Sequence, residues 1–212
     1  ELVLSDERVR QLISSERLWC LYRGTIPAPD FLESALMALE MWLLERAKRG
    51  EDLTETALKI LSETSSVALV SVLISVALAY QSALGAAKLP LISTFEFFKL
   101  DRSRMLRDQS HNPDVRSWLG VPTGGLEDIF YSERKSSNDL PHRKHDLEHL
   151  AITLQTGPDA VSAHKAIDRM RRSMLGQESH GTVEERLAFK RFDLREWHVK
   201  EQTTEGKIIV AP

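Results

Sequence analysis

"TSSVALVSVLISVALAYQSALGAA", residues Thr64 to Ala87, is the stretch that decides the fold, because none of its residues is charged. A membrane-spanning helix needs about 20 predominantly apolar residues. The strongly apolar part here runs only from Val67 to Tyr80, and Ser71 and Ser75 interrupt it. We therefore expect a helix that is buried on all sides within a helical protein, and no membrane span.

The segment from Asp30 to Gly50 carries the clearest helix signals in the chain. Asp30 and Glu33 have the spacing of a capping box at the start, and Gly50 is a natural stop at the end. Leucines recur on one face of this segment, at Leu32, Leu36, Leu39 and Leu43. Further apolar side chains widen the apolar surface beyond one stripe: Phe31, Ala35, Met37, Ala38 and Trp42.

Helical patterns also cover most of the remaining chain. They span Ser5–Tyr22, Leu91–Asp108, Pro141–Gln155, Ala160–Leu175 and Thr182–Phe192. The tail alternates polar and apolar residues around a Thr-Glu-Gly turn, which predicts a β-hairpin or an edge strand. The predicted fold is all-α, a solenoid-like array of helical hairpins with a small C-terminal β-hairpin or edge strand.

We interpret residues 1–212 as a single helical domain. A possible subdivision is a helical core over 1–108, an irregular connection over 109–140, and a second helical part with a β tail over 141–212. The chain begins with Glu1 and carries no signal pattern, so we interpret it as a piece of a larger protein.

The composition limits the function classes. A formal charge of −3 provides no general attraction for nucleic acid or for an anionic membrane. The single cysteine, Cys20, excludes an internal disulfide and a thiolate metal cluster, and it lies among apolar residues typical of a core. This cysteine usage is typical of a reducing compartment, and we expect a cytoplasmic protein.

The stretch "LPHRKHDLEHLAITLQ", Leu140 to Gln155, is the strongest candidate for chemistry. On one helix, His142, His145 and His149 would share a face and could hold a zinc or nickel ion, with Asp146 or Glu148 as a further ligand or base. The spacing differs from the two-histidine, one-glutamate helix of metalloproteases. Acids near a helix start are also favourable without any metal, so we interpret the stretch as a solvated helix start. A metal-dependent hydrolase that uses the three histidines is the alternative function.

Two further patterns bear on ligand binding. Gly176 to Thr182, "GQESHGT", has the glycine spacing of a P-loop but lacks its lysine and follows a helix, so nucleotide binding of that kind is not expected. Lys165, Arg169 and Arg172 form a basic stripe, with Arg171 alongside. Asp168 dilutes this stripe, so a nucleic-acid-sensing helical module is a second alternative and not the main expectation.

Several stretches together resemble one family. They are "SERLWCLYRGTIPAPDFLESALMALEMWLLERA" (Ser15–Ala47), "SVALVSVLISVALAY" (Ser66–Tyr80), "ERKSSNDLPHRKHDLEHLAITLQ" (Glu133–Gln155) and "KRFDLREW" (Lys190–Trp197). In this order they are similar to the region that follows the nucleotide-binding module in large bacterial STAND-type ATPases, signal-transduction ATPases with numerous domains. Many of those proteins are associated with antiviral defence.

The resemblance implies a non-catalytic helical scaffold or sensor segment that makes protein–protein or intramolecular contacts. None of the family's nucleotide-binding motifs matches a position in this sequence, so no ATP-binding residue is implied. We therefore expect no catalytic, cofactor-binding or metal-ligating residue and no cofactor, although the parent protein would be an ATPase. The implied partners are other domains of the parent protein or a protein trigger, with oligomerisation through the parent ATPase.

Overall fold

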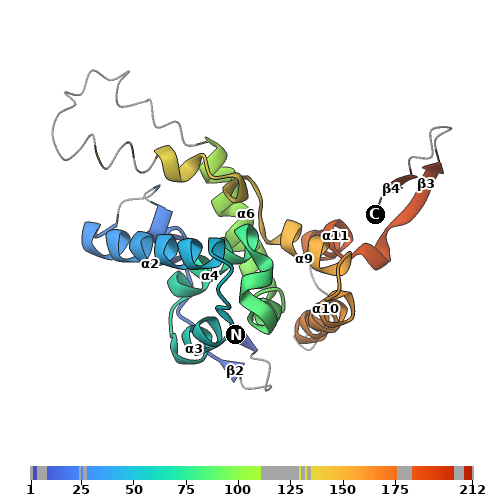
Figure 1. Ribbon diagram of the computed structural model, residues 1–212. Helices are drawn as coiled ribbons and strands as arrows, with labels where there is room; N and C mark the ends of the chain where they lie inside the picture. The colour runs from blue at the N-terminus through green and yellow to red at the C-terminus, as the bar shows by residue number, and fades with distance from the viewer. Residues whose placement is uncertain are drawn as a thin grey trace.

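The computed structural model describes residues 2–3, 9–23, 25, 28–110, 129, 132, 135–175, 183–202 and 208–211. Helices dominate these residues, so the all-α prediction is confirmed (Figure 1). The predicted irregular connection falls largely on residues outside the described set, and Gly176 to Thr182 lie outside it as well.

The elements follow one another in two groups. The first group holds α1 (Glu16–Trp19), η1 (Leu21–Arg23), α2 (Asp30–Lys48), α3 (Thr54–Glu63), α4 (Val67–Ala79), η2 (Gln81–Ala87), α5 (Lys88–Leu91) and α6 (Phe95–Ser110). The second group holds η3 (Pro141–Lys144), α9 (Leu147–Gln155), α10 (Ala160–Leu175), α11 (Val183–Phe192) and η4 (Leu194–Glu196).

Two short antiparallel ribbons accompany the helices. β1 (Leu2–Val3) pairs with β2 (Val9–Arg10), so the helix predicted from Ser5 is wrong in its first half. The helix begins only at Glu16, where the Ser15 side chain accepts a hydrogen bond from the Leu18 amide and provides the cap. At the other end, β3 (His198–Gln202) pairs with β4 (Ile208–Ala211), which confirms the predicted C-terminal hairpin.

α4 is the central helix of the protein. Its residues Val70, Val72, Leu73, Ile74 and Val76 are fully buried, as the absence of charge predicted. The Ser66 side chain caps the helix by accepting from the Ala68 amide. None of the helices that the structure describes is long and apolar enough to cross a membrane.

The other helices gather around α4. α1, α2, α3, α5, η3 and α9 all contact it, so the array is more closed than an open stack of hairpins. The buried hydrophobic residues of both helical groups form one cluster. Phe98 of α6 stacks on Phe192 of α11 with ring centroids 4.5 Å apart, and Phe95 stacks on Phe189. These aromatic pairs join the second helical group to the first.

Candidate functional site

The histidine-rich stretch does not form the single helix that its sequence predicted. η3 ends at Lys144, His145 is extended, and α9 begins at Leu147. Asp146 explains the break, because its side chain accepts a hydrogen bond from the His149 amide and its backbone is extended (φ −117°, ψ −178°). An aspartate in this conformation satisfies an otherwise unpaired amide at a helix start and so favours a new helix over a continued one.

The break separates the three histidines. His142 is buried, and its Nε2 lies 3.1 Å from the Ser75 Oγ of α4. His145 and His149 lie outside and stack on each other with ring centroids 4.0 Å apart. The prediction that all three share one helix face is therefore wrong. Among the residues that the structure describes, no group of three His, Cys, Asp or Glu side chains could hold a metal ion.

The two acids of the stretch are also committed to other partners. The Asp146 carboxylate accepts from Arg102 at 3.0 Å as well as capping α9. Glu148 forms an ion pair with Arg191 of α11 at 2.7 Å. Both acids thus hold α9 against its neighbours.

We define the strap as residues 135–146, the segment that leads into α9 and includes η3. Polar groups of the first helical group hold it. Arg23 donates to the Asn138 side chain at 2.7 Å, and Arg104 donates to the main-chain oxygens of Arg143 and His145 at 3.0 and 2.6 Å. Apart from Pro141, Leu140 is the only apolar residue of the strap, and it is partly buried.

A buried ion pair anchors the middle of the strap. The Arg143 Nη2 donates to one carboxylate oxygen of Glu40 on α2, and the Ser75 hydroxyl donates to the other. The Arg143 guanidinium also lies over the Tyr22 ring, 5.5 Å from its centroid. Glu40, Arg143 and Ser75 are all buried, so this contact joins the strap to both α2 and α4 without access to water.

A second set of buried charges surrounds the first. Arg104 pairs with Asp101 at 3.0 Å and with Asp108 at 3.1 Å, and Arg23 also pairs with Asp108. The Trp19 indole donates to Asp101 at 3.3 Å. We call both sets together the buried charge network: Trp19, Tyr22, Arg23, Glu40, Ser75, Asp101, Arg104, Asp108, His142 and Arg143.

Burial changes the titration of this network. It raises the pKa of Glu40 to about 7, while the hydrogen bond from Ser75 lowers it. Arg143 donates directly to the same carboxylate and favours its ionised form, so we describe the two as an ion pair. Burial also raises the pKa of Tyr22, which keeps its hydroxyl neutral.

Ser75, His142 and Glu40 are the residue types of a nucleophilic triad, but their arrangement is different. In a triad the carboxylate orients the histidine, and the histidine accepts the serine proton. Here the Ser75 hydroxyl donates to Glu40 itself. The side chain is also buried in the centre of the protein, so this trio is an internal hydrogen-bond network and not a site for attack on a substrate.

The other sequence candidates also have structural partners. In the basic stripe, Arg171 pairs with Asp193 at 2.9 Å and with Glu196 at 3.0 Å. Lys165 and Arg172 remain exposed on α10. Burial raises the pKa of the Cys20 thiol to about 11, so this cysteine is an unreactive core residue as expected.

Sequence reasoning missed most of the buried charge network. One signal was available, because Glu33 and Glu40 lie seven residues apart on the face of α2 that is buried. An acid at a core position requires a partner, which points to a buried cation elsewhere. Nothing in the sequence indicated that the cation would be Arg143.

His142 gives the network a predicted pH dependence. Burial lowers the pKa of His142 to about 4, with further lowering by the charges of Arg23, Arg104 and His145. The unfolded chain therefore takes up this proton at higher pH than the folded chain. Stability is then complete above about pH 6.5 and falls by on the order of 3 kcal/mol as the pH drops to about 4.

Urea unfolding between pH 7 and pH 4 measures this effect. We expect His142→Asn to lose much of the decline that the wild-type protein shows, because asparagine does not titrate there. His164→Asn, at a partly exposed histidine of α10, is the matched control and should retain the decline. An unchanged decline in His142→Asn would contradict the prediction.

Comparisons with known proteins do not identify a family or a function for this chain. No protein-family model matches the chain, and no curated protein matches it.

Proposed function

We propose that the chain is a non-catalytic helical scaffold and relay segment, in which the strap is the part that responds to a partner. The observation that carries this proposal is the way in which the strap is held. Buried charges and hydrogen bonds fix the strap to α2, α4 and α6, whereas Leu140 is its one apolar side chain that packs against the hydrophobic core.

The physical argument concerns the free energy of detachment. Removing an apolar segment from a core exposes its surface to water at about 25 cal/mol per Å². A buried ion pair differs, because the charges regain hydration when they separate, and its net contribution to stability is often near zero. The strap therefore has one well-defined position, but little free energy is needed to detach it from the helices. These are the properties of an element that can switch between two states.

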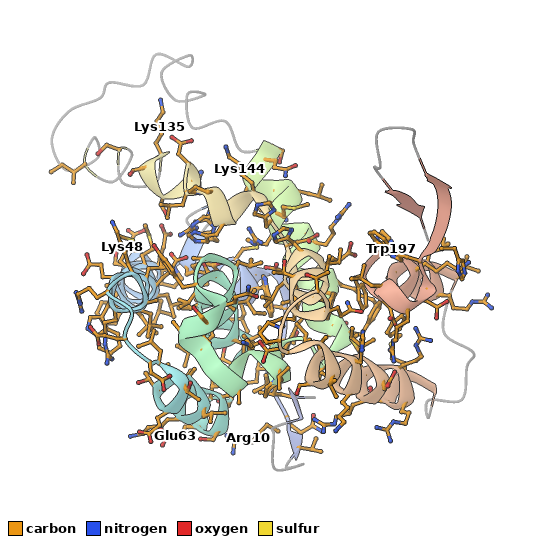
Figure 2. The ribbon with its side chains drawn as sticks, turned by 45° about the vertical axis from the view of Figure 1, so that its right-hand side comes forward. Arg10, Lys48, Glu63, Lys135, Lys144 and Trp197 are labelled. Carbon is orange, nitrogen blue, oxygen red and sulfur yellow. The ribbon has the colours of Figure 1, made fainter. Side chains whose placement is uncertain are left out.

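The outer side of the strap is where a partner could bind. Lys144 and His145 of the strap are exposed, as is His149 of the adjoining α9, while the adjacent His142 and Arg143 point into the network. Figure 2 shows Lys144 and Lys135 on the outside of the molecule. A protein that contacts these outer groups can shift the strap and so reach α2, α4 and α6 through Glu40, Ser75 and Arg104.

The context of this relay is proposed from the family resemblance. We infer that the chain belongs to a large bacterial STAND-type ATPase of antiviral defence and acts in the cytoplasm. Its partners would then be a protein trigger or other domains of the same polypeptide. The relay would couple contact at the strap to the state of the ATPase.

The test uses the whole polypeptide that contains this segment. The double variant Glu40→Leu/Arg143→Met replaces the ion pair with apolar groups. Detachment of the strap would then expose apolar surface to water, so the strap should stay bound to α2 and α4. We expect ATP hydrolysis without trigger to be unchanged and the response to trigger to be lost. The control Arg49→Met removes an exposed ion pair with Glu51 and should leave the response intact. A full response in the double variant would contradict the relay.

Metal analysis separates this proposal from the hydrolase alternative. Zinc bound in stoichiometric amount and lost in His145→Ala, together with a hydrolytic activity lost in the same variant, would contradict a scaffold. Salt-dependent DNA or RNA binding that weakens in Arg169→Glu would instead favour the nucleic-acid alternative.

A further inference from the structure

Arg143 uses only part of its guanidinium in the buried charge network. Its Nη2 donates to one carboxylate oxygen of Glu40, and the Ser75 hydroxyl donates to the other oxygen. Among the residues that the structure describes, the Nε and Nη1 of Arg143 have no hydrogen-bond partner, although its side chain is only 2% exposed. Buried donors without a partner are rare and unfavourable. Arg143 is therefore incompletely satisfied where it lies.

A carboxylate is the group that would satisfy Arg143 more completely. A guanidinium can donate through two parallel N–H groups to the two oxygens of one carboxylate, and such pairs are stronger than single hydrogen bonds. Glu40 does not pair in this way, because only one of its oxygens accepts from Arg143. The strap thus carries a residue that an outside carboxylate can pair with better than Glu40 does.

The outer side of the strap has an excess of positive charge. Its exposed basic side chains, together with one from the adjoining α9, are Lys135, Lys144, His145 and His149. Figure 2 shows Lys135 and Lys144 along the outer edge of the molecule. Within the strap, whose residues are all described, Asp139 is the one exposed acid. The whole chain carries a formal charge of −3, so the excess is local and attracts an anionic partner.

We propose that the partner of the strap is an acidic protein segment, and that one of its carboxylates pairs with Arg143 when the strap leaves the network. This inference rests on the relay proposed above and names the chemistry of its partner. Lys144 and His145 hold the segment at the surface. A partner shifts a two-state element only through contacts that differ between the two states. Arg143 provides such a contact, because it is buried until the strap moves.

A protein segment fits this surface better than a nucleic acid does. Nucleic acids are bound by cations that follow the phosphates along a groove, often with aromatic side chains that stack on bases. The strap is short, and none of its residues is aromatic apart from its histidines. Asp139 is exposed among the cations, so a dense row of phosphates would meet repulsion as well as attraction. A short run of Asp or Glu residues can place one carboxylate at Arg143 and the others near Lys144.

Fluorescence anisotropy with a labelled decaglutamate peptide tests the partner chemistry. We expect saturable binding to the wild-type chain that weakens as salt is added, and no binding of decaglutamine, which has the same length without the charge. Lys144→Gln should weaken binding roughly threefold or more, because it removes a cation from the surface. Lys165→Gln removes an exposed lysine of α10 and is the matched control, which should bind like wild type.

Two changes that break the same ion pair test the role of Arg143. Glu40→Gln removes the anion but leaves the arginine, so decaglutamate should bind roughly tenfold more tightly. Arg143→Met removes the arginine, so binding should weaken roughly tenfold. The double variant Glu40→Leu/Arg143→Met also lacks the arginine and should bind as weakly, and circular dichroism establishes that each variant is folded. If Glu40→Gln and Arg143→Met tightened binding equally, release of the strap alone would govern binding and the role of Arg143 would be overturned.

Hydrogen exchange separates this inference from the relay itself. Decaglutamate should speed exchange of the Arg143 and His145 amides and leave the amides of α4 unchanged. A strap that opens in hydrogen exchange but does not bind decaglutamate at low salt would overturn the acidic partner and leave the relay intact. Strap amides that exchange only with global unfolding would overturn both. A single-stranded oligonucleotide that binds more tightly than decaglutamate would overturn the choice of a protein segment.

Discussion

Arg143→Met is expected to lower the free energy of unfolding by about 3–5 kcal/mol, the usual effect of removing one partner from a buried ion pair. The loss arises at Glu40, whose carboxylate would keep the Ser75 hydrogen bond but lose its cation in a site without access to water. Chemical denaturation followed by circular dichroism at pH 7 measures the change. Arg49→Met is the control, because its ion pair with Glu51 is exposed to solvent and should contribute little to stability.

The double variant Glu40→Leu/Arg143→Met separates charge from packing. Replacing a buried pair by apolar groups is often neutral or stabilising by about 1–4 kcal/mol. We therefore expect the double variant to be at least as stable as the wild type, although each single change destabilises. Losses that add in the double variant would show that the ion pair is a net source of stability, and the argument for a releasable strap would fail.

Phe192→Ala is the second change with a large expected effect. Phe192 is fully buried at the end of α11, stacks on Phe98 of α6, and contacts Phe189 with ring centroids 5.3 Å apart. Truncation of such a side chain leaves a cavity and costs about 3–5 kcal/mol. Urea unfolding provides the measurement.

Leu187→Ala on the same helix is the control for Phe192→Ala, because Leu187 is exposed. We expect a change within about 0.5 kcal/mol for this surface position. A small effect of Phe192→Ala would mean that α11 is not held to α6 by its aromatic residues. The two helical groups would then be less firmly joined than the shared core indicates.

The helices with broad apolar patterns could be predicted from the sequence because burial decides them. α4 has no charged residue and is the central helix. α2 begins at Asp30 as predicted, but its cap residue is Pro29 and no side chain caps it, so the predicted capping box of Asp30 and Glu33 is wrong. The helix predicted from Ser5 and the helix predicted from Pro141 failed for local reasons. Ser15 and Asp146 each cap a new helix, and a short polar side chain at such a position outweighs a weak apolar periodicity.

The candidate site could be predicted only in part. The sequence identified the stretch from Leu140 to Gln155 as unusual but assigned its histidines to one face. Arg143 meets Glu40 across 103 positions of the chain, a pairing that depends on how α2 and η3 pack on α4. Local spacing does not determine such a contact. Acids at buried positions of α2 indicate that a cationic partner is needed, but they do not identify it.

The position of the strap links the network to the proposed function. His142 and Arg143 reach inward to Ser75 and Glu40, whereas Lys144 and His145 face outward. Neighbouring residues of one short segment thus face both the protein interior and the surface. In the proposed relay, a change on the outside of the strap is passed to α2, α4 and α6 through these contacts.

Native-state hydrogen exchange tests the central claim most directly, because it compares the opening of the strap with the unfolding of α4. The strap amides of Arg143 and His145 are hydrogen-bonded to Leu140 and His142, and those of α4 lie in the buried core. We predict that the strap exchanges through an opening of much lower free energy than α4, and that Glu40→Leu/Arg143→Met raises its protection toward that of α4. Strap amides that exchange only with global unfolding in the wild-type protein would contradict the account.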